Sequence, residues 1–146
     1  MEIKLKQFKN ALDGFEYLVK LDFEDLKTRV NEKIIDGIKN GQAQKFEMCT
    51  ELEWKIVKRF LYEHDGIDSR SPKQAIKDFY LAGYIEEKDY LLLNDMINDR
   101  NKVSHIYNEK EFNKVVDKFP QYLKLMENVY QIVSSSLNPN MVETTK

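Results

Sequence analysis

A chain of 146 residues is long enough for one domain with a single hydrophobic core, which at this size buries roughly 68–70% of the surface of the unfolded chain. Charged residues make up 33% of the sequence but nearly cancel, which leaves a net charge of -2 and a pI near 5.8. This balance argues against a general electrostatic binder of nucleic acids, which is usually basic, while it leaves room for a local basic site that acts on one phosphate.

Cysteine content and hydropathy indicate where the protein is located. Cys49 is the single cysteine, so no disulfide can form within the chain, and its helical surroundings favour a small buried thiol. The first residues are amphipathic rather than continuously apolar, and no later run approaches the roughly 20 apolar residues needed to cross a bilayer. We therefore expect a cytoplasmic protein without a membrane segment.

Helices are expected to dominate, because glycine and proline are few and apolar residues recur mostly at spacings of three and four. The pattern predicts a first helix over about 3–20. Asp22 can cap a second helix that ends near Gly41, since glycine suits the left-handed conformation that closes many helices. A third helix is predicted over about 42–64, ending at Gly66.

The second half of the chain carries clear helix starts and stops. Ser71 can cap a fourth helix, with proline at the next position and glutamine three residues beyond the cap, and this helix stops near Gly83. A fifth helix is predicted over about 86–106, because Asn108 begins a capping-box pattern for a sixth. Pro120 should kink or break that last helix at the preceding residue.

These elements predict an all-α fold, an up-and-down bundle of four to five main helices without internal repeats. Residues 1–136 are expected to form this single domain. The segment 137–146 has no core-forming pattern, so we expect it to be a disordered C-terminal tail.

The predicted fifth helix carries an arginine on its apolar face. A helical wheel places Arg100 among six apolar residues, Leu92, Leu93, Met96, Ile97, Val103 and Ile106. Because burying an isolated charge is costly, this guanidinium should be paired or functional. Asn101 and His105 fall on the other side, where His105 would be exposed or would face a second subunit.

The predicted third helix carries carboxylates on its apolar stripe. Glu47 lies close to Trp54 on the wheel, and Glu51 lies at the edge of the same face. Either carboxylate could cross the bundle and neutralise Arg100, so a static ion pair and a functional site are both open at this point. In either case we expect Arg100 to lie in or beside the core, within reach of Glu47 or Glu51.

Metal and cofactor sites are not expected. Two histidines and one cysteine without ligand-like spacing do not make a zinc site, and the helix dipole accounts for His64 near the end of its helix. Glu47 and Glu51 could hold a metal only with carboxylates from elsewhere, and the Glu-x-x-His partners of a di-iron bundle are missing. The sequence also lacks phosphate-binding loops, dinucleotide-binding loops and the nucleophile elbow.

Two motifs together resemble a known family. Residues 100–107, Arg-Asn-Lys-Val-Ser-His-Ile-Tyr, resemble the signature of HEPN domains, an arginine and a polar residue followed by three residues and a histidine. The tyrosine two residues after this histidine, Tyr107, is similar to that of a subgroup encoded beside small nucleotidyltransferases. The segment Phe46-Glu47-x-x-x-Glu51-x-x-Trp54-Lys55 resembles the third-helix signature of the nucleotidyltransferase substrate-binding protein family. Length and helix order extend the resemblance over nearly the whole chain.

The resemblance implies a HEPN-type helical bundle that forms a homodimer, with both motifs at the subunit interface. It implies a two-gene toxin-antitoxin module in which a minimal nucleotidyltransferase, encoded by a neighbouring gene, is the partner. The helical protein would be a metal-independent ribonuclease, held in check when the partner adds adenylate to the motif tyrosine, here Tyr107 (AMPylation). The older family name implies instead a non-catalytic substrate-binding subunit of the transferase, and the acidic balance of the chain favours this alternative.

If the protein cleaves RNA, the motif residues take distinct catalytic roles. His105 would exchange a proton with a ribose 2′-hydroxyl or with the leaving oxygen. Arg100 would hold the scissile phosphate, and Asn101 would position one of the two by hydrogen bonding. Arg100 and His105 point about 140° apart on a continuous helix, so the helix end or a second subunit must bring them together. The third-helix motif residues, Glu47, Glu51, Trp54 and Lys55, are expected to support this site.

Overall fold

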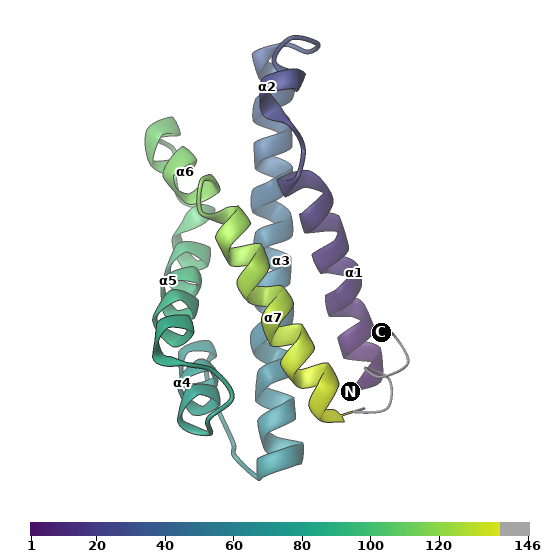
Figure 1. Ribbon diagram of the computed structural model, residues 1–146. Coiled ribbons are helices and arrows are strands. Elements are labelled where there is room, and N and C mark those ends of the chain that lie inside the picture. Colours follow the sequence, from purple (N-terminus) through teal and green to yellow (C-terminus); the bar gives the residue numbers. More distant parts are fainter. Residues whose placement is uncertain (138–146) are drawn as a thin grey trace.

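The computed structural model describes residues 1–137. In this range it contains seven helices and no strand: α1 (Glu2–Val19), α2 (Phe23–Leu26), α3 (Glu32–Asp65), α4 (Pro72–Leu81), α5 (Glu87–Val103), α6 (Glu109–Val116) and α7 (Phe119–Leu137). Five of them have ten residues or more, which confirms the predicted all-α bundle. The long helix α3 runs through the molecule, with α1 and α7 packed along it and α4 and α5 on the other side (Figure 1).

Helix α3 differs from the prediction, which placed a helix boundary near Gly41. Asp22 caps only the four-residue helix α2, and Asn31 starts α3 by accepting a hydrogen bond from a backbone N–H three residues later. From there α3 continues through Gly41 without interruption. The predicted boundary is wrong because contacts with α1 outweigh the cost of about 1 kcal/mol for glycine in a helix. The Gln42 side chain donates to the Leu18 carbonyl at 2.8 Å, which holds this part of α3 against the end of α1.

The other predicted starts and stops are close to those of the structure. Gly66 closes α3 at φ 68°, and Ser71 caps α4 by accepting from the Gln74 N–H at 3.1 Å. Asn108 caps α6 through two backbone N–H groups. The chain breaks before Pro120, which lies in the first turn of α7, where its missing N–H costs no helix bond. Of the predicted disordered tail, all but Leu137 lies outside the described residues.

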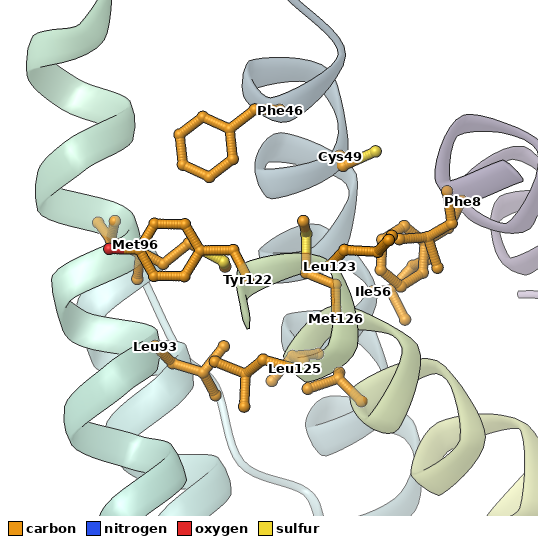
Figure 2. Close-up of a cluster of buried hydrophobic side chains, with 14 of the residues drawn as sticks. Phe8, Phe46, Cys49, Ile56, Leu93, Met96, Tyr122, Leu123, Leu125 and Met126 are labelled. Atoms are coloured by element: carbon orange, nitrogen blue, oxygen red, sulfur yellow. The ribbon is translucent and has the colours of Figure 1, made fainter. Parts of the chain in front are cut away.

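Aromatic rings join α1, α3 and α7 at the centre of the bundle. Phe46 of α3 stacks on Tyr122 of α7, with ring centroids 5.5 Å apart, and lies 4.8 Å from the ring of Phe119. The ring of Phe15 from α1 lies 5.4 Å from that of Phe119. Figure 2 shows Phe46 and Tyr122 beside Met96, so α5 reaches the same cluster. Rings at such distances contribute about 0.5–1.5 kcal/mol beyond the burial of their apolar surface, and they fix the helices against one another.

None of the helices that the structure describes contains a stretch long and apolar enough to cross a membrane.

Two glycines offer a paired test of the backbone. Gly66 has φ 68°, whereas Gly37 lies in the helical interior of α3, and an added Cβ would meet no atom within 4 Å at either position. Gly66→Ala is therefore expected to lower the free energy of unfolding by about 1 kcal/mol, and Gly37→Ala to raise it by about 0.5–1 kcal/mol. Urea unfolding of the two variants and the wild type measures whether each substitution raises or lowers the free energy of unfolding. Equal effects would show that φ at position 66 does not control this helix end.

Candidate functional site

Arg100 lies in the last turn of α5 and pairs across the bundle with α3. Its Nη2 donates to Glu51 Oε2 at 3.1 Å, and each of the two side chains is 37% exposed. This confirms the prediction that Arg100 lies beside the core within reach of Glu47 or Glu51. Its Nε is buried and has no hydrogen-bond partner in the described part of the chain. The guanidinium is thus held at the edge of the core with part of it open to solvent.

Glu51 is the centre of a small polar cluster on this face of α3. Besides Arg100, it accepts from Trp54 Nε1 at 3.2 Å and pairs with Lys55 Nζ at 3.2 Å. Partial burial opposes its ionised form, but the hydrogen bonds from Trp54 and Lys55 and the nearby positive charges lower the pKa of Glu51 below its usual value. Arg100, Trp54 and Lys55 therefore all bind the Glu51 carboxylate, which is ionised at neutral pH.

Helix α5 ends at Val103, three residues earlier than predicted. The His105 N–H donates to the Lys102 carbonyl at 2.9 Å, so the chain makes a last tight turn and then leaves the helix. The angle of about 140° between Arg100 and His105 was calculated for a continuous helix. Because the helix ends before His105, that angle does not describe the direction of its side chain. Asn101 and His105 are both exposed, as predicted. Asn101 Oδ1 lies 3.5 Å from Arg100 Nη1, the limit of a hydrogen bond.

The structure brings Arg100 together with Asn101 and Glu51 but not with His105. No hydrogen bond joins Arg100 to His105 in residues 1–137. The guanidinium and the imidazole thus lie close together in sequence, without a direct bond between them.

Tyr107 is 94% exposed, on the segment between α5 and α6. A helical wheel carried on to Tyr107 would put it near Met96, where a phenol at a helix end can keep its ring against the core while its hydroxyl reaches water. The structure differs, because α5 ends four residues before Tyr107 and the wheel does not extend to it. The whole phenol is open to an incoming molecule.

Glu47 does not join the polar cluster around Arg100. It is half-buried and lines a hollow of about 570 Å³ between α3, the segment that follows α5, and α6. Tyr107 lines the same hollow, and Lys39, which also lines it, donates to Asn113 at 3.3 Å. The two motifs are therefore in contact where Glu51 pairs with Arg100, and they line one hollow together through Glu47 and Tyr107.

Asp99 was missed by the sequence reasoning, which placed Arg100 in the middle of the apolar face. Asp99 is the charged residue buried there, at 3% exposure, and Arg100 lies at the edge. Its carboxylate accepts a hydrogen bond from the Tyr122 hydroxyl and pairs with Lys102 and Lys118. Burial and this hydrogen bond raise the pKa of Tyr122 well above its usual range. A usable signal existed, because Asp99 follows Met96 by three residues and precedes Val103 by four.

Glu53 is a second buried acid that the sequence reasoning missed. It is 1% exposed, and its Oε1 has no hydrogen-bond partner among the described residues. Burial raises the pKa of Glu53 to about 8, so the side chain is largely protonated at neutral pH. Its spacing from Thr50 and Val57, both buried on the same helix, was the available signal.

The described residues contain no group of three or more histidine, cysteine or acidic side chains placed to hold a metal ion.

The fold and the site define a class of protein, an all-α bundle in which an arginine at the end of one helix is paired with a glutamate of a long central helix. The sequence model of the family described as "Nucleotidyltransferase substrate binding protein like" matches residues 3–135. The chain therefore belongs to the nucleotidyltransferase substrate-binding protein-like family, which confirms the family resemblance. No curated protein sequence matches the chain.

A solved structure agrees with the fold. The crystal structure of a protein from Thermus thermophilus is similar to this one with a TM-score of 0.75 and 25% sequence identity. The similarity covers 86% of this chain and 98% of that chain.

Glu53 makes stability depend on pH in a direction that can be tested. The folded state keeps its proton up to about pH 8, whereas the unfolded chain loses it near 4.5, so the free energy of unfolding is expected to fall as pH rises between these values. Glu53→Gln removes this dependence. Relative to the wild type, the variant's free energy of unfolding should rise by on the order of 3 kcal/mol between about pH 5 and pH 8, measured by urea unfolding.

The quantity to compare is how the free energy of unfolding changes with pH. A cost of burying the glutamine amide is the same at every pH, so it does not affect this change. Glu32→Gln, at the exposed start of α3, is the matched control and should follow the wild type. A Glu53→Gln curve parallel to that of the wild type would contradict the prediction.

Proposed function

We propose that this protein is a HEPN-type toxin of a two-gene toxin-antitoxin module, a metal-independent endoribonuclease controlled by a partner nucleotidyltransferase. The observation that carries the proposal is the placement of Arg100. Its guanidinium is held half-exposed by Glu51, next to Asn101 and five residues before the exposed His105. Membership of the nucleotidyltransferase substrate-binding protein-like family supports the association with a nucleotidyltransferase.

The contacts of Arg100 suit a phosphate-binding role. Glu51 engages Nη2, so donors on the guanidinium remain for a phosphate, and arginine binds such a group through two parallel hydrogen bonds. Glu51 is itself shared with Trp54 and Lys55, which divides its charge among three donors. Holding the arginine in place before substrate binds lowers the entropy cost of binding.

His105 supplies the proton transfer that RNA cleavage needs. The ribose 2′-hydroxyl attacks the adjacent phosphorus, its proton passes to an imidazole, and a proton is returned to the 5′-oxygen that leaves. The products are a 2′,3′-cyclic phosphate and a free 5′-hydroxyl, so atoms and charges balance without a metal ion. Arg100 would neutralise the charge that builds up on the phosphate oxygens.

A second copy of the chain completes this proposal. Arg100 and His105 of one chain are not joined by a hydrogen bond in the described residues, and both lie at the C-terminal end of α5. Met48, one turn before Glu51 on α3, is 44% exposed and adds an apolar residue to the same region. We propose a homodimer with twofold symmetry in this region, so that Arg100 of one chain and His105 of the other face the same phosphate.

The ribonuclease proposal is tested by cleavage of single-stranded RNA in EDTA. The wild type should cleave, and His105→Gln should lower the rate about 100-fold or more, because general acid-base catalysis contributes about that much. His64→Gln is the matched control, since it removes the other histidine of the chain, and it should keep the activity. Circular dichroism checks that both variants are folded. Equal activity of the two variants, or an inactive wild type on a broad pool of RNA, contradicts the proposal.

The second candidate function is a non-catalytic substrate-binding subunit of the nucleotidyltransferase. The hollow of about 570 Å³ that Glu47 and Tyr107 line favours it, as does the net charge of -2. An inactive wild type in the cleavage experiment would make this the leading function.

Control by the partner is tested at Tyr107. With its phenol 94% exposed, Tyr107 can reach the active site of a second enzyme, and adenylate joined there adds a bulky anion near the end of α5. Incubation with the neighbouring nucleotidyltransferase, ATP and magnesium should add the mass of adenylate, measured on the intact protein. Tyr107→Phe should gain none, whereas Tyr17→Phe, at a tyrosine 69% exposed on α1, should be modified like the wild type. Mass added equally to all three proteins, or to none by an active transferase, would exclude Tyr107 as the acceptor.

A further inference from the structure

Three lysines line a second hollow on the other side of Tyr107. This hollow, of about 590 Å³, is lined by Lys102 from the last turn of α5, Lys114 from α6 and Lys118 from the turn before α7. Tyr107 lines it as well as the hollow that contains Glu47. Three successive segments of the chain thus each place a lysine in the lining of a hollow that the exposed tyrosine also lines.

Two of these lysines are held in place by the buried carboxylate of Asp99. Lys102 Nζ lies 3.4 Å from its Oδ1 and Lys118 Nζ lies 3.2 Å from its Oδ2, while the Asp99 side chain is 4% exposed. One carboxylate cannot neutralise two ammonium groups. Each ammonium has three N–H donors and uses one of them to bind Asp99. The Lys102 side chain is 60% exposed and that of Lys118 is 47% exposed. The lysine side chains therefore carry positive charge at the surface, and their conformations are already restricted before an anion binds.

The acids of the same hollow limit how strongly it can bind an anion. Glu111 pairs with Lys114 at 3.1 Å, an exposed contact that contributes little and can be exchanged, and Asp117 also lines the hollow. A free anion is therefore expected to bind weakly. An anion that other contacts already hold nearby gains from its high effective concentration, which favours a phosphate within a nucleotide or an RNA strand.

We propose that Lys102, Lys114 and Lys118 form a phosphate-binding subsite beside Tyr107 that takes the phosphate of a nucleotide. This proposal rests on the proposed function, in which Tyr107 receives adenylate and the chain binds RNA. It adds the side chains that would hold the phosphate. The nucleotide can be one that is brought to Tyr107 or one within a bound RNA strand, and the two sources share this chemistry.

The test measures binding rather than catalysis. His105→Gln protein, whose cleavage of RNA should be at least about 100-fold slower under the proposed mechanism, is labelled with 15N and titrated by NMR with AMP and, separately, with a ten-nucleotide single-stranded uridylate. The backbone amides of residues 102–118 should shift with at least one probe. Adding Lys102→Gln and Lys114→Gln should weaken that binding about tenfold. Both lysines are 60% exposed, and the contact between Lys118 and Asp99 stays intact, so the fold is expected to persist.

A matched control carries the same change in charge elsewhere on the surface. Lys77→Gln with Lys124→Gln, both exposed and neither lining the hollow, should leave binding within about twofold of the unmodified background. If Lys102→Gln with Lys114→Gln weakens only the binding of AMP, the subsite holds a nucleotide brought to Tyr107. If it weakens only the binding of the uridylate, the subsite holds a phosphate of the RNA strand.

Two results overturn the proposal. One is that neither probe shifts residues 102–118, and the other is that the control pair weakens binding as much as Lys102→Gln with Lys114→Gln. If Lys102→Gln with Lys114→Gln alters amides across α1, which would mean a disturbed fold, Lys102→Gln alone should still weaken binding about threefold. None of these outcomes depends on RNA cleavage, so failure of the subsite and failure of the ribonuclease proposal remain distinguishable.

Discussion

Helix α3 has 34 residues, so at 1.5 Å per residue it extends about 50 Å, roughly twice the length of α5 or α7. No single partner can cover a helix of that length. Helices α1 and α7 pack along one side of it, and α4 and α5 along the other (Figure 1). Glu51 lies in the stretch where α5 reaches α3, and Glu47, one turn earlier, faces the hollow beside α6. The unbroken course of α3 therefore decides where both motif regions can form.

Adjacent acidic and basic residues fix the rotation of α5 at this junction. Asp99 is buried against Tyr122 of α7, and Arg100 pairs with Glu51 of α3. A hydrogen bond to a buried charge contributes about 1.5–3 kcal/mol, whereas a pair as exposed as Arg100 with Glu51 contributes at most about 1 kcal/mol. Asp99 is thus the stronger structural anchor. Arg100 adds little to stability by comparison, which is compatible with the proposed role of its guanidinium in binding a phosphate.

The sequence predicted best those features that local interactions determine. Caps at Ser71 and Asn108 and the glycine end at Gly66 depend on residues within one turn, and all three appear in the structure. The pairing of Arg100 with a carboxylate of the third helix was also predictable, because an isolated charge on an apolar face requires a partner.

The features that sequence reasoning missed depend on distant contacts. Gly41 stays helical because α1 packs against α3 there. Asp99 is buried because the hydroxyl of Tyr122, 23 residues later, reaches its carboxylate. A helical wheel contains neither contact, so it placed Arg100 in the middle of the buried face and carried the helix on toward Tyr107.

The two sides of α5 separate the two anion sites proposed above. Arg100 turns toward α3 and pairs with Glu51, while Lys102, two residues later and so about 160° away around the helix, pairs with Asp99 on the side of α6 and α7. A phosphate at Arg100 and a phosphate at Lys102 are therefore different ligands, or different parts of one long ligand. Under the proposed control mechanism, a nucleotide on Tyr107 that is held by the lysines would not replace the RNA phosphate at Arg100. It would instead obstruct the path around the end of α5, where His105 lies and where the second copy of the chain is proposed to approach.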